Sequence, residues 1–263
     1  MAIHSKASTI KLLITGTCSG LGKYLHENMG GVELHKSISE EAQKEICSAD
    51  YDAIIHCAAN SSTGIDSTSL YSYLDDNLFL TKRLTSIRPK LFVYMSSVDV
   101  YPQKDCLHSE DQIIDADTLR GIYATTKLAS ETLIQHHCPN YLILRGVTLL
   151  GKYSRKNTLI KIIENEKCEV GLSGDSIYNI ITYFDIKNFI QFALEKNFHG
   201  IYNLASSDNI KLSDIAGSMN RKVQFGTHIY RVGNIDNRKI ASVFPRFKKS
   251  SLDSLLQYTN KVK

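Results

Sequence analysis

The stretch that decides the fold is IKLLITGTCSGLG, residues 10–22. An apolar run over residues 10–14 is followed by three closely spaced glycines, Gly16, Gly20 and Gly22. Gly16 permits a tight turn out of a buried strand, and Gly20 or Gly22 lets a ligand approach the backbone and a helix pack on the strand. Amide groups at the start of that helix then attract phosphate. A strand–turn–helix without a ligand is the alternative.

Short apolar runs alternate with helical patterns through the first 150 residues. Strands are expected at 10–15, 32–35, 53–57, 91–96 and 141–145, and helices at 20–29, 39–47, 68–87 and 122–137. This alternation predicts βαβ units in an α/β, doubly wound parallel sheet that is covered on both faces.

The pattern loosens after residue 151. Helices are expected at 157–166 and 185–196 and a strand at 201–204, with no long strand in the remainder. Residues 1–150 therefore indicate a nucleotide-binding core, to which 185–205 could return. Residues 151–184 and 206–263 indicate a smaller, substrate-binding part.

The composition excludes several classes of protein. The chain has 263 residues, 43% of them hydrophobic, and a net charge of +4. It contains no long run of like charges, so we expect no nucleic-acid partner. Six cysteines show no CxxC pair and no metal-ligand spacing, so we expect reduced thiols and no metal. Because neither a signal peptide nor a membrane span is recognisable, a cytoplasmic protein without a membrane partner is expected.

The second strand ends in Glu33-Leu34-His35-Lys36. In dinucleotide-binding sheets, an acidic residue near this point binds the ribose 2′-hydroxyl, whereas a basic side chain accommodates a 2′-phosphate. If the strand ends at Leu34 or His35, its tip is His35 and Lys36, which favours NADP over NAD. If it ends earlier, Glu33 is the acid instead.

Two further groups of residues carry chemistry. Tyr123 and Lys127 are four positions apart on a predicted helix, so they share one face. An ammonium group there would lower the pKa of the tyrosine, which could then exchange a proton with a carbonyl/alcohol couple during hydride transfer. Ser96 and Ser97 end the strand 91–96 at the sheet edge where ligands bind. Simple capping of a turn is the alternative for both serines.

Taken in order, these residues resemble the extended branch of the short-chain dehydrogenase/reductase superfamily, the NAD-dependent epimerase/dehydratase family, which acts on nucleotide sugars. The segments that carry the resemblance are HCAA (56–59), DDNLFLT (75–81), SSVDVYP (96–102), YATTKLASE (123–131), LRGVTLLG (144–151), GD (174–175), TYFD (182–185) and GIYNLA (200–205). The resemblance implies a Rossmann core that binds NADP or NAD and a smaller C-terminal part that holds a sugar nucleotide.

The resemblance also implies roles for single residues. Tyr123 would be the acid–base, Lys127 would assist it and hold the nicotinamide ribose, and Ser97 would orient the substrate carbonyl. Asp99 and Arg238 would meet the substrate, Arg238 near its phosphates. The residues implied at the cofactor are Gly16, Cys18, Ser19, Gly20, Leu21, Gly22, His35, Lys36, Cys57, Ala58, Ala59, Asn77, Tyr123 and Lys127. A homodimer through the Tyr123 helix and the helix before it is typical of the family.

The chain departs from the family pattern at some positions. Ser19 stands where the extended branch has its middle glycine, whereas the long separation of Ser97 and Tyr123 fits that branch. Val98 and Asp99 occupy the positions of the Asp-Glu pair of the dehydratases, so we do not expect elimination. Reduction of a 4-keto group is favoured by the small size and the NADP-type tip. A 4-epimerase and a non-catalytic NADP-binding regulator stay open as alternatives, as do the base and the sugar.

Overall fold

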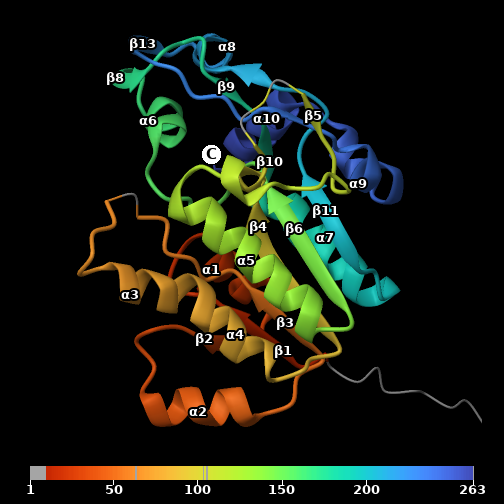
Figure 1. Ribbon diagram of the computed structural model, residues 1–263. Coiled ribbons are helices and arrows are strands. Elements are labelled where there is room, and N and C mark those ends of the chain that lie inside the picture. Colours follow the sequence, from red (N-terminus) through yellow and green to blue (C-terminus); the bar gives the residue numbers. More distant parts are fainter. Residues whose placement is uncertain (1–9, 63, 103, 105, 263) are drawn as a thin grey trace, which may run out of the picture.

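The computed structural model describes residues 10–62, 64–102, 104 and 106–262 (Figure 1). Its central sheet has six strands in the order β11-β6-β4-β3-β1-β2, and every neighbouring pair is parallel. The strands are β1 (Leu12–Thr15), β2 (Val32–Leu34), β3 (Ala53–His56), β4 (Leu91–Ser97), β6 (Tyr141–Gly146) and β11 (Gly200–Leu204). The predicted α/β fold is therefore confirmed.

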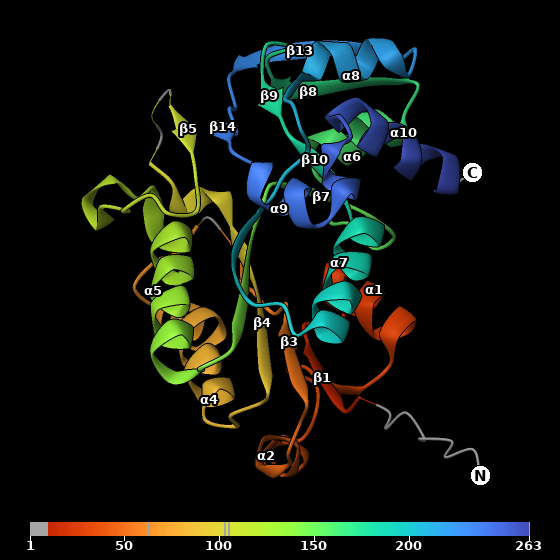
Figure 2. The same ribbon diagram turned by 90° about the vertical axis from the view of Figure 1, so that its right-hand side faces the viewer.

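Helices cover both faces of this sheet, as Figure 2 shows. The helices α1 (Gly20–Met29) and α7 (Tyr183–Lys196) lie on one side, and α4 (Leu80–Thr85) and α5 (Gly121–His137) lie on the other. Successive side chains of β1 pack on opposite faces of the sheet. Ile14 belongs to the apolar cluster that includes residues of α1 and α7, and Leu13 belongs to the cluster that includes residues of α4 and α5. Because both faces are buried, β1, β3 and β4 are continuous apolar runs.

The strand order reverses between β1 and β3. The chain leaves β1 through α1 to the edge strand β2, and α2 (Glu40–Ser48) then leads back to β3 on the other side of β1. Open α/β sheets bind ligands outside the carboxyl ends of the strands at such a point. The glycine loop after β1 and the residues after β3 therefore lie side by side at the edge where a ligand is expected.

The helix expected over 68–87 is divided in the structure. It consists of α3 (Leu70–Leu74), a π-helical turn η1 (Asp75–Phe79) and α4. In η1, the Asn77 side chain accepts a hydrogen bond from the Asn60 amide (2.8 Å) and donates one to the Asn60 carbonyl (2.9 Å). Such π-turns are common at functional sites.

The remaining elements gather at one end of the sheet (Figure 1). They are η2 (Val98–Val100), β5 (Leu107–His108), η3 (Ala116–Thr118), β7 (Thr148–Leu150), α6 (Thr158–Glu164), β8 (Lys167–Leu172), β9 (Ile177–Tyr178), β10 (Ile180–Thr182), β12 (Ile210–Lys211), α8 (Leu212–Ser218), β13 (Lys222–His228), β14 (Asn234–Ile235), α9 (Arg238–Val243), η4 (Pro245–Lys248) and α10 (Ser251–Val262). A separate apolar cluster, which includes Leu159, Ile162 and Leu255, holds part of this region together. Within the described ranges, no helix is both long and apolar enough to cross a membrane.

The absence of a long strand after residue 206 was a wrong prediction. The strand β13 has seven residues and pairs in parallel with β8. Its side chains are exposed or half-buried, because among the described residues it pairs with β8 alone, in a two-stranded sheet. The strand therefore lacks the continuous apolar run that marks the strands of the central sheet.

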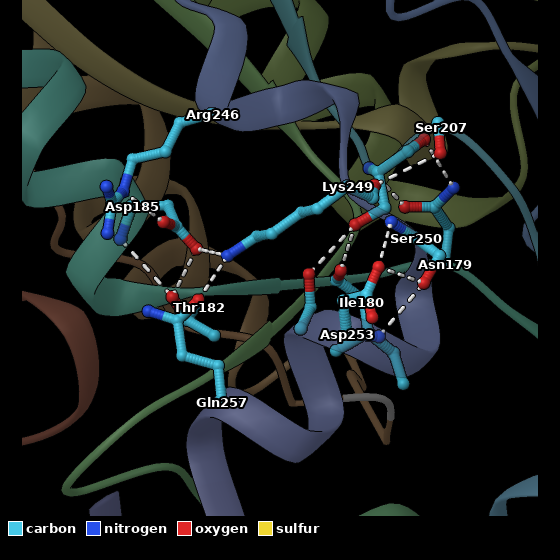
Figure 3. A network of polar contacts seen from close by, with 12 residues as sticks. Asn179, Ile180, Thr182, Asp185, Ser207, Arg246, Lys249, Ser250, Asp253 and Gln257 are labelled. Carbon is cyan, nitrogen blue, oxygen red and sulfur yellow. Dashed lines mark hydrogen bonds and ion pairs between the residues drawn. The ribbon is translucent and has the colours of Figure 1, made fainter.

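The C-terminal segment is tied to the start of α7 by a buried carboxylate (Figure 3). Asp185 is fully buried and accepts hydrogen bonds from the Arg246 guanidinium (Nε, 3.0 Å), the Lys249 ammonium and the Thr182 hydroxyl. Removing one partner of a buried ion pair is costly, because the other charge stays in a poorly solvated place. This cluster therefore fixes η4 and the start of α10 against the core.

Candidate functional site

The glycine loop is shaped by contacts that leave no room for side chains. A Cβ on Gly16, whose φ is +74°, would lie 2.8 Å from the Ala58 amide nitrogen, and one on Gly22 would lie 2.5 Å from the Gly16 carbonyl oxygen. Gly20 has a φ of +58° but faces open space, with only the Tyr183 hydroxyl 3.6 Å from its virtual Cβ. The loop therefore forms a cradle at the N-terminus of α1, and this cradle fits a dinucleotide diphosphate.

The end of β3 forms the second wall of this cradle. The Thr15 hydroxyl oxygen accepts hydrogen bonds from the amides of Cys57 (3.2 Å) and Ala58 (3.1 Å) and is joined to His56 Nδ1 at 2.7 Å. Burial lowers the pKa of His56 to about 3, so its imidazole is neutral. The predicted cofactor residues Cys57, Ala58 and Ala59 thus lie directly beside the glycine loop. On the loop itself, Cys18 and Ser19 are exposed and Leu21 is buried.

At the end of β2, the acidic and the basic candidates for binding the adenosine ribose lie close together. The strand ends at Leu34, so His35 and Lys36 follow it directly. The Glu33 carboxylate accepts a hydrogen bond from the Thr17 hydroxyl of the glycine loop (3.0 Å) and lies 3.9 Å from His35 Nε2. Lys36 is exposed and pairs with Asp76 at 2.6 Å. Glu33 therefore touches the loop, whereas Lys36 is held by another carboxylate.

The three predicted catalytic residues come from two elements. Ser97 ends β4, and Tyr123 and Lys127 lie on α5, one turn apart. Lys127 is buried, donates a hydrogen bond to the Met95 carbonyl (2.7 Å) and lies 5.7 Å from the centroid of the Tyr123 ring. Burial lowers the pKa of Lys127 to about 8. Ser97 donates a hydrogen bond to the Asp99 carboxylate (3.0 Å).

The pKa of Tyr123 differs in direction from the sequence-based expectation. Burial, and next to it the negative charge of Asp99, raises this pKa to about 12, although hydrogen bonding with Ser97 acts to lower it. The sequence predicted a lowered pKa because Lys127 is one turn away. In the folded chain the loss of water and the nearby carboxylate outweigh that effect. The tyrosine therefore keeps its proton at neutral pH.

A second tyrosine lies close to this group and was missed by the sequence analysis. Tyr73 on α3 is 1% exposed, and its hydroxyl has no hydrogen-bond partner among the residues that the structure describes. Burial raises its pKa, and the side chains of Thr126 and Asn77 act in the opposite direction, so the hydroxyl lies near both. A buried hydroxyl without a partner is unusual and is consistent with a site that takes up a ligand or water.

A cavity of about 380 Å³ opens beside Tyr123. Its lining is Asp99, Arg120, Tyr123, Ile229, Tyr230 and Arg231. Arg238 does not line it, because the Arg238 guanidinium forms a paired contact with Asp236, with Nη2 to Oδ2 at 2.6 Å. The arginines that line the cavity beside Tyr123 are Arg120 and Arg231. Arg120 could have been noticed three residues before Tyr123, whereas nothing local in the sequence marks Arg231.

Comparison with protein families gives a match over most of the chain. Residues 13–205 match the model of the NAD dependent epimerase/dehydratase family. The chain belongs to this family. Membership confirms the expected class of cofactor, a nicotinamide adenine dinucleotide. No protein of curated function matches the sequence.

Several solved structures share the fold. A dTDP-4-dehydrorhamnose reductase from Yersinia enterocolitica is 21% identical, with a TM-score of 0.78 over 95% of this chain and 99% of that one. The Bacillus anthracis dTDP-4-dehydrorhamnose reductase, in complex with NADP, is 18% identical, with a TM-score of 0.77 over 96% and 99%. UDP-glucuronic acid 4-epimerase from Bacillus cereus, with UDP-glucuronic acid and NAD, is 18% identical, with a TM-score of 0.76 over 97% and 100%. At these identities the similarity establishes the fold alone.

Proposed function

We propose that this chain is an NADP- or NAD-dependent oxidoreductase that reduces the 4-keto group of a nucleotide-activated sugar. The observation that carries the proposal is the convergence of Tyr123, with Ser97 and Lys127 beside it, on a cavity that also contains Arg120 and Arg231. Two guanidinium groups without a carboxylate partner among the described residues suit the diphosphate of a sugar nucleotide.

The bound dinucleotide supplies the hydride that reduces the carbonyl carbon. Tyr123, protonated at neutral pH, donates its phenolic proton to the carbonyl oxygen. Ser97 orients that oxygen: its hydroxyl, which donates a hydrogen bond to the Asp99 carboxylate in the ligand-free chain (3.0 Å), would turn to donate to the substrate oxygen. Lys127 holds the nicotinamide ribose and stabilises the tyrosinate that is left.

The deciding experiment is the consumption of NADPH with a panel of nucleotide 4-keto sugars. We expect turnover by the wild-type chain and none by Tyr123→Phe, which should still bind the cofactor. Interconversion of 4-hydroxy epimers without net use of cofactor would favour the epimerase instead. Tight cofactor binding without turnover across the panel would favour the non-catalytic regulator.

For the cofactor itself we propose NADP, on the basis of His35 and Lys36 directly after β2. Glu33 provides the test. If the chain binds a 2′-phosphate at this corner, Glu33→Gln should tighten NADPH binding by removing a like charge, and Lys36→Ala should weaken it. If Glu33 instead binds the ribose diol, Glu33→Gln should weaken NADH binding, and the preference for NADP is then wrong.

We also propose a homodimer in the cytoplasm. The α3–η1 surface next to α5 presents Tyr71 and Phe79, 73% and 40% exposed, with ring centroids 6.2 Å apart, which supports a face buried by a second copy. All six cysteines are free, which supports a reducing compartment. Light scattering of the wild type and of Tyr71→Lys tests the dimer: a monomeric wild type contradicts it.

A further inference from the structure

Residues 151–156, between β7 and α6, form what we call the strap. It begins against α7, since a Cβ on Gly151 would lie 2.1 Å from the Tyr183 ring. Tyr153 then anchors it on α1: its carbonyl accepts a hydrogen bond from the Gly20 amide (3.1 Å), and its hydroxyl donates one to Glu27 (2.7 Å). The strap therefore covers the amide of Gly20, the first residue of α1.

Arg155 extends from the strap to the opposite wall of the cradle. Its guanidinium donates hydrogen bonds to the Ser61 hydroxyl (2.6 Å) and the Ala59 carbonyl (3.4 Å), just after β3. The positive charge of Arg155 also acts to lower the pKa of Tyr123 and of Tyr183, against the larger effect of burial. The guanidinium therefore lies beside the end of β3 and within electrostatic reach of both rings.

In the ligand-free chain, the guanidinium of Arg155 has only uncharged acceptors among its described hydrogen-bond partners. Both acceptors are neutral, and within the described part of the chain no carboxylate pairs with this guanidinium. Residues 15–22 contain no lysine or arginine, so the glycine loop offers amides, a helix terminus and the exposed Ser19 hydroxyl to a diphosphate, but no cation. A diphosphate bound in the cradle would thus lack a cationic side chain from the loop itself.

We propose that Arg155 is a cofactor-binding residue, carried by the strap, which pairs with the diphosphate of the bound dinucleotide. On binding, a phosphate oxygen takes the Gly20 amide from the Tyr153 carbonyl, and the guanidinium exchanges Ser61 and Ala59 for phosphate oxygens. The guanidinium would exchange two neutral acceptors for a charged one that can accept two parallel hydrogen bonds, so the exchange is favourable. The strap then covers the diphosphate and excludes water from it.

The test compares Arg155→Gln with Lys156→Gln, a neighbouring exposed cation on the same strap. Binding is measured by titration with NADPH, ADP-ribose, AMP and UDP. We expect Arg155→Gln to weaken NADPH and ADP-ribose by about 10- to 100-fold, as for the loss of hydrogen bonds to a charged group, and to leave AMP and UDP within about 2-fold. Lys156→Gln should change none of them by more than about 2-fold.

Three outcomes would overturn the proposal. Unchanged or tighter ADP-ribose binding by Arg155→Gln means that the strap merely blocks the site. An equal loss of ADP-ribose affinity in Arg155→Gln and Lys156→Gln indicates a general effect of positive charge. A loss confined to UDP assigns Arg155 to the diphosphate of the sugar nucleotide.

A second measurement does not depend on a variant. Amide hydrogen exchange of residues 151–156 in the wild-type chain should slow when ADP-ribose is added, and unchanged exchange contradicts closure of the strap. The role of Arg155 depends on the dinucleotide of the family and not on the proposed sugar substrate. A failed turnover assay therefore leaves this test intact.

Discussion

Replacing Lys127 by methionine should stabilise the ligand-free chain while it removes activity. Lys127 is 4% exposed, and burial lowers its pKa from 10.5 to about 8. At 1.36 kcal/mol per pKa unit, keeping this group charged at pH 7 costs about 3 kcal/mol. Methionine has nearly the same length and no charge. It loses the hydrogen bond from the charged ammonium to the Met95 carbonyl, worth about 2 kcal/mol, so a net gain of about 1 kcal/mol is expected at pH 7.

The gain should shrink as the pH rises. Below pH 8, Lys127 is protonated in both the folded and the unfolded chain, so the wild type bears the full free-energy cost of burying the ammonium. Between pH 8 and 10.5 the folded chain has lost this proton and the unfolded chain still binds it, so the stability of the wild type rises with pH. By pH 9.5 the wild type should have recovered about 2 kcal/mol relative to Lys127→Met.

Urea unfolding of both chains at pH 6.5, 7.5, 8.5 and 9.5 measures this difference. Other groups that titrate in this range are common to both chains and cancel in the comparison, except Cys57, whose pKa the charge of Lys127 acts to lower. Lys44→Met, at an exposed position on α2, is the matched control and should show a difference that does not vary with pH. A constant difference between wild type and Lys127→Met, or one that grows with pH, would refute the assignment of Lys127 as a desolvated ammonium.

Three further substitutions test other parts of the structure. Tyr73→Phe removes a buried hydroxyl without a partner in the described chain and should gain about 1 kcal/mol, raising the melting temperature by about 2–4 °C; a lower melting temperature contradicts this. Asp185→Asn leaves Arg246 and Lys249 without their carboxylate and should cost about 1–3 kcal/mol in urea unfolding, since the Arg246 side chain is 46% exposed and can still be solvated, so an unchanged midpoint would disprove the role of the cluster in Figure 3. Gly22→Ala places a methyl group 2.5 Å from a backbone oxygen and should abolish cofactor binding; titration with NADPH checks it, and wild-type affinity would show that the loop adapts.

The sequence by itself determined the sheet and the place of the cofactor. Apolar runs alternating with helical patterns predicted the central strands to within about two residues, because a strand buried on both faces must be apolar throughout. The glycines of residues 16–22 were recognisable because close contacts exclude a Cβ at Gly16 and Gly22, and a positive φ favours glycine at Gly20. The spacing of Tyr123 and Lys127 was sufficient to place both on one face of α5. These are local properties, determined within a few residues of each other.

Only the tertiary structure decided which charged groups meet. Arg155 and Ser61 are 94 positions apart, and Arg246 and Asp185 are 61 apart, so no local pattern could pair them. Arg238 resembled a phosphate-binding residue in the sequence, yet it is held by Asp236, while Arg120 and Arg231 line the cavity. The direction of the Tyr123 pKa was decided in the same way. Desolvation and the charge of Asp99 depend on what packs around the ring, and the spacing to Lys127 contains no information about either.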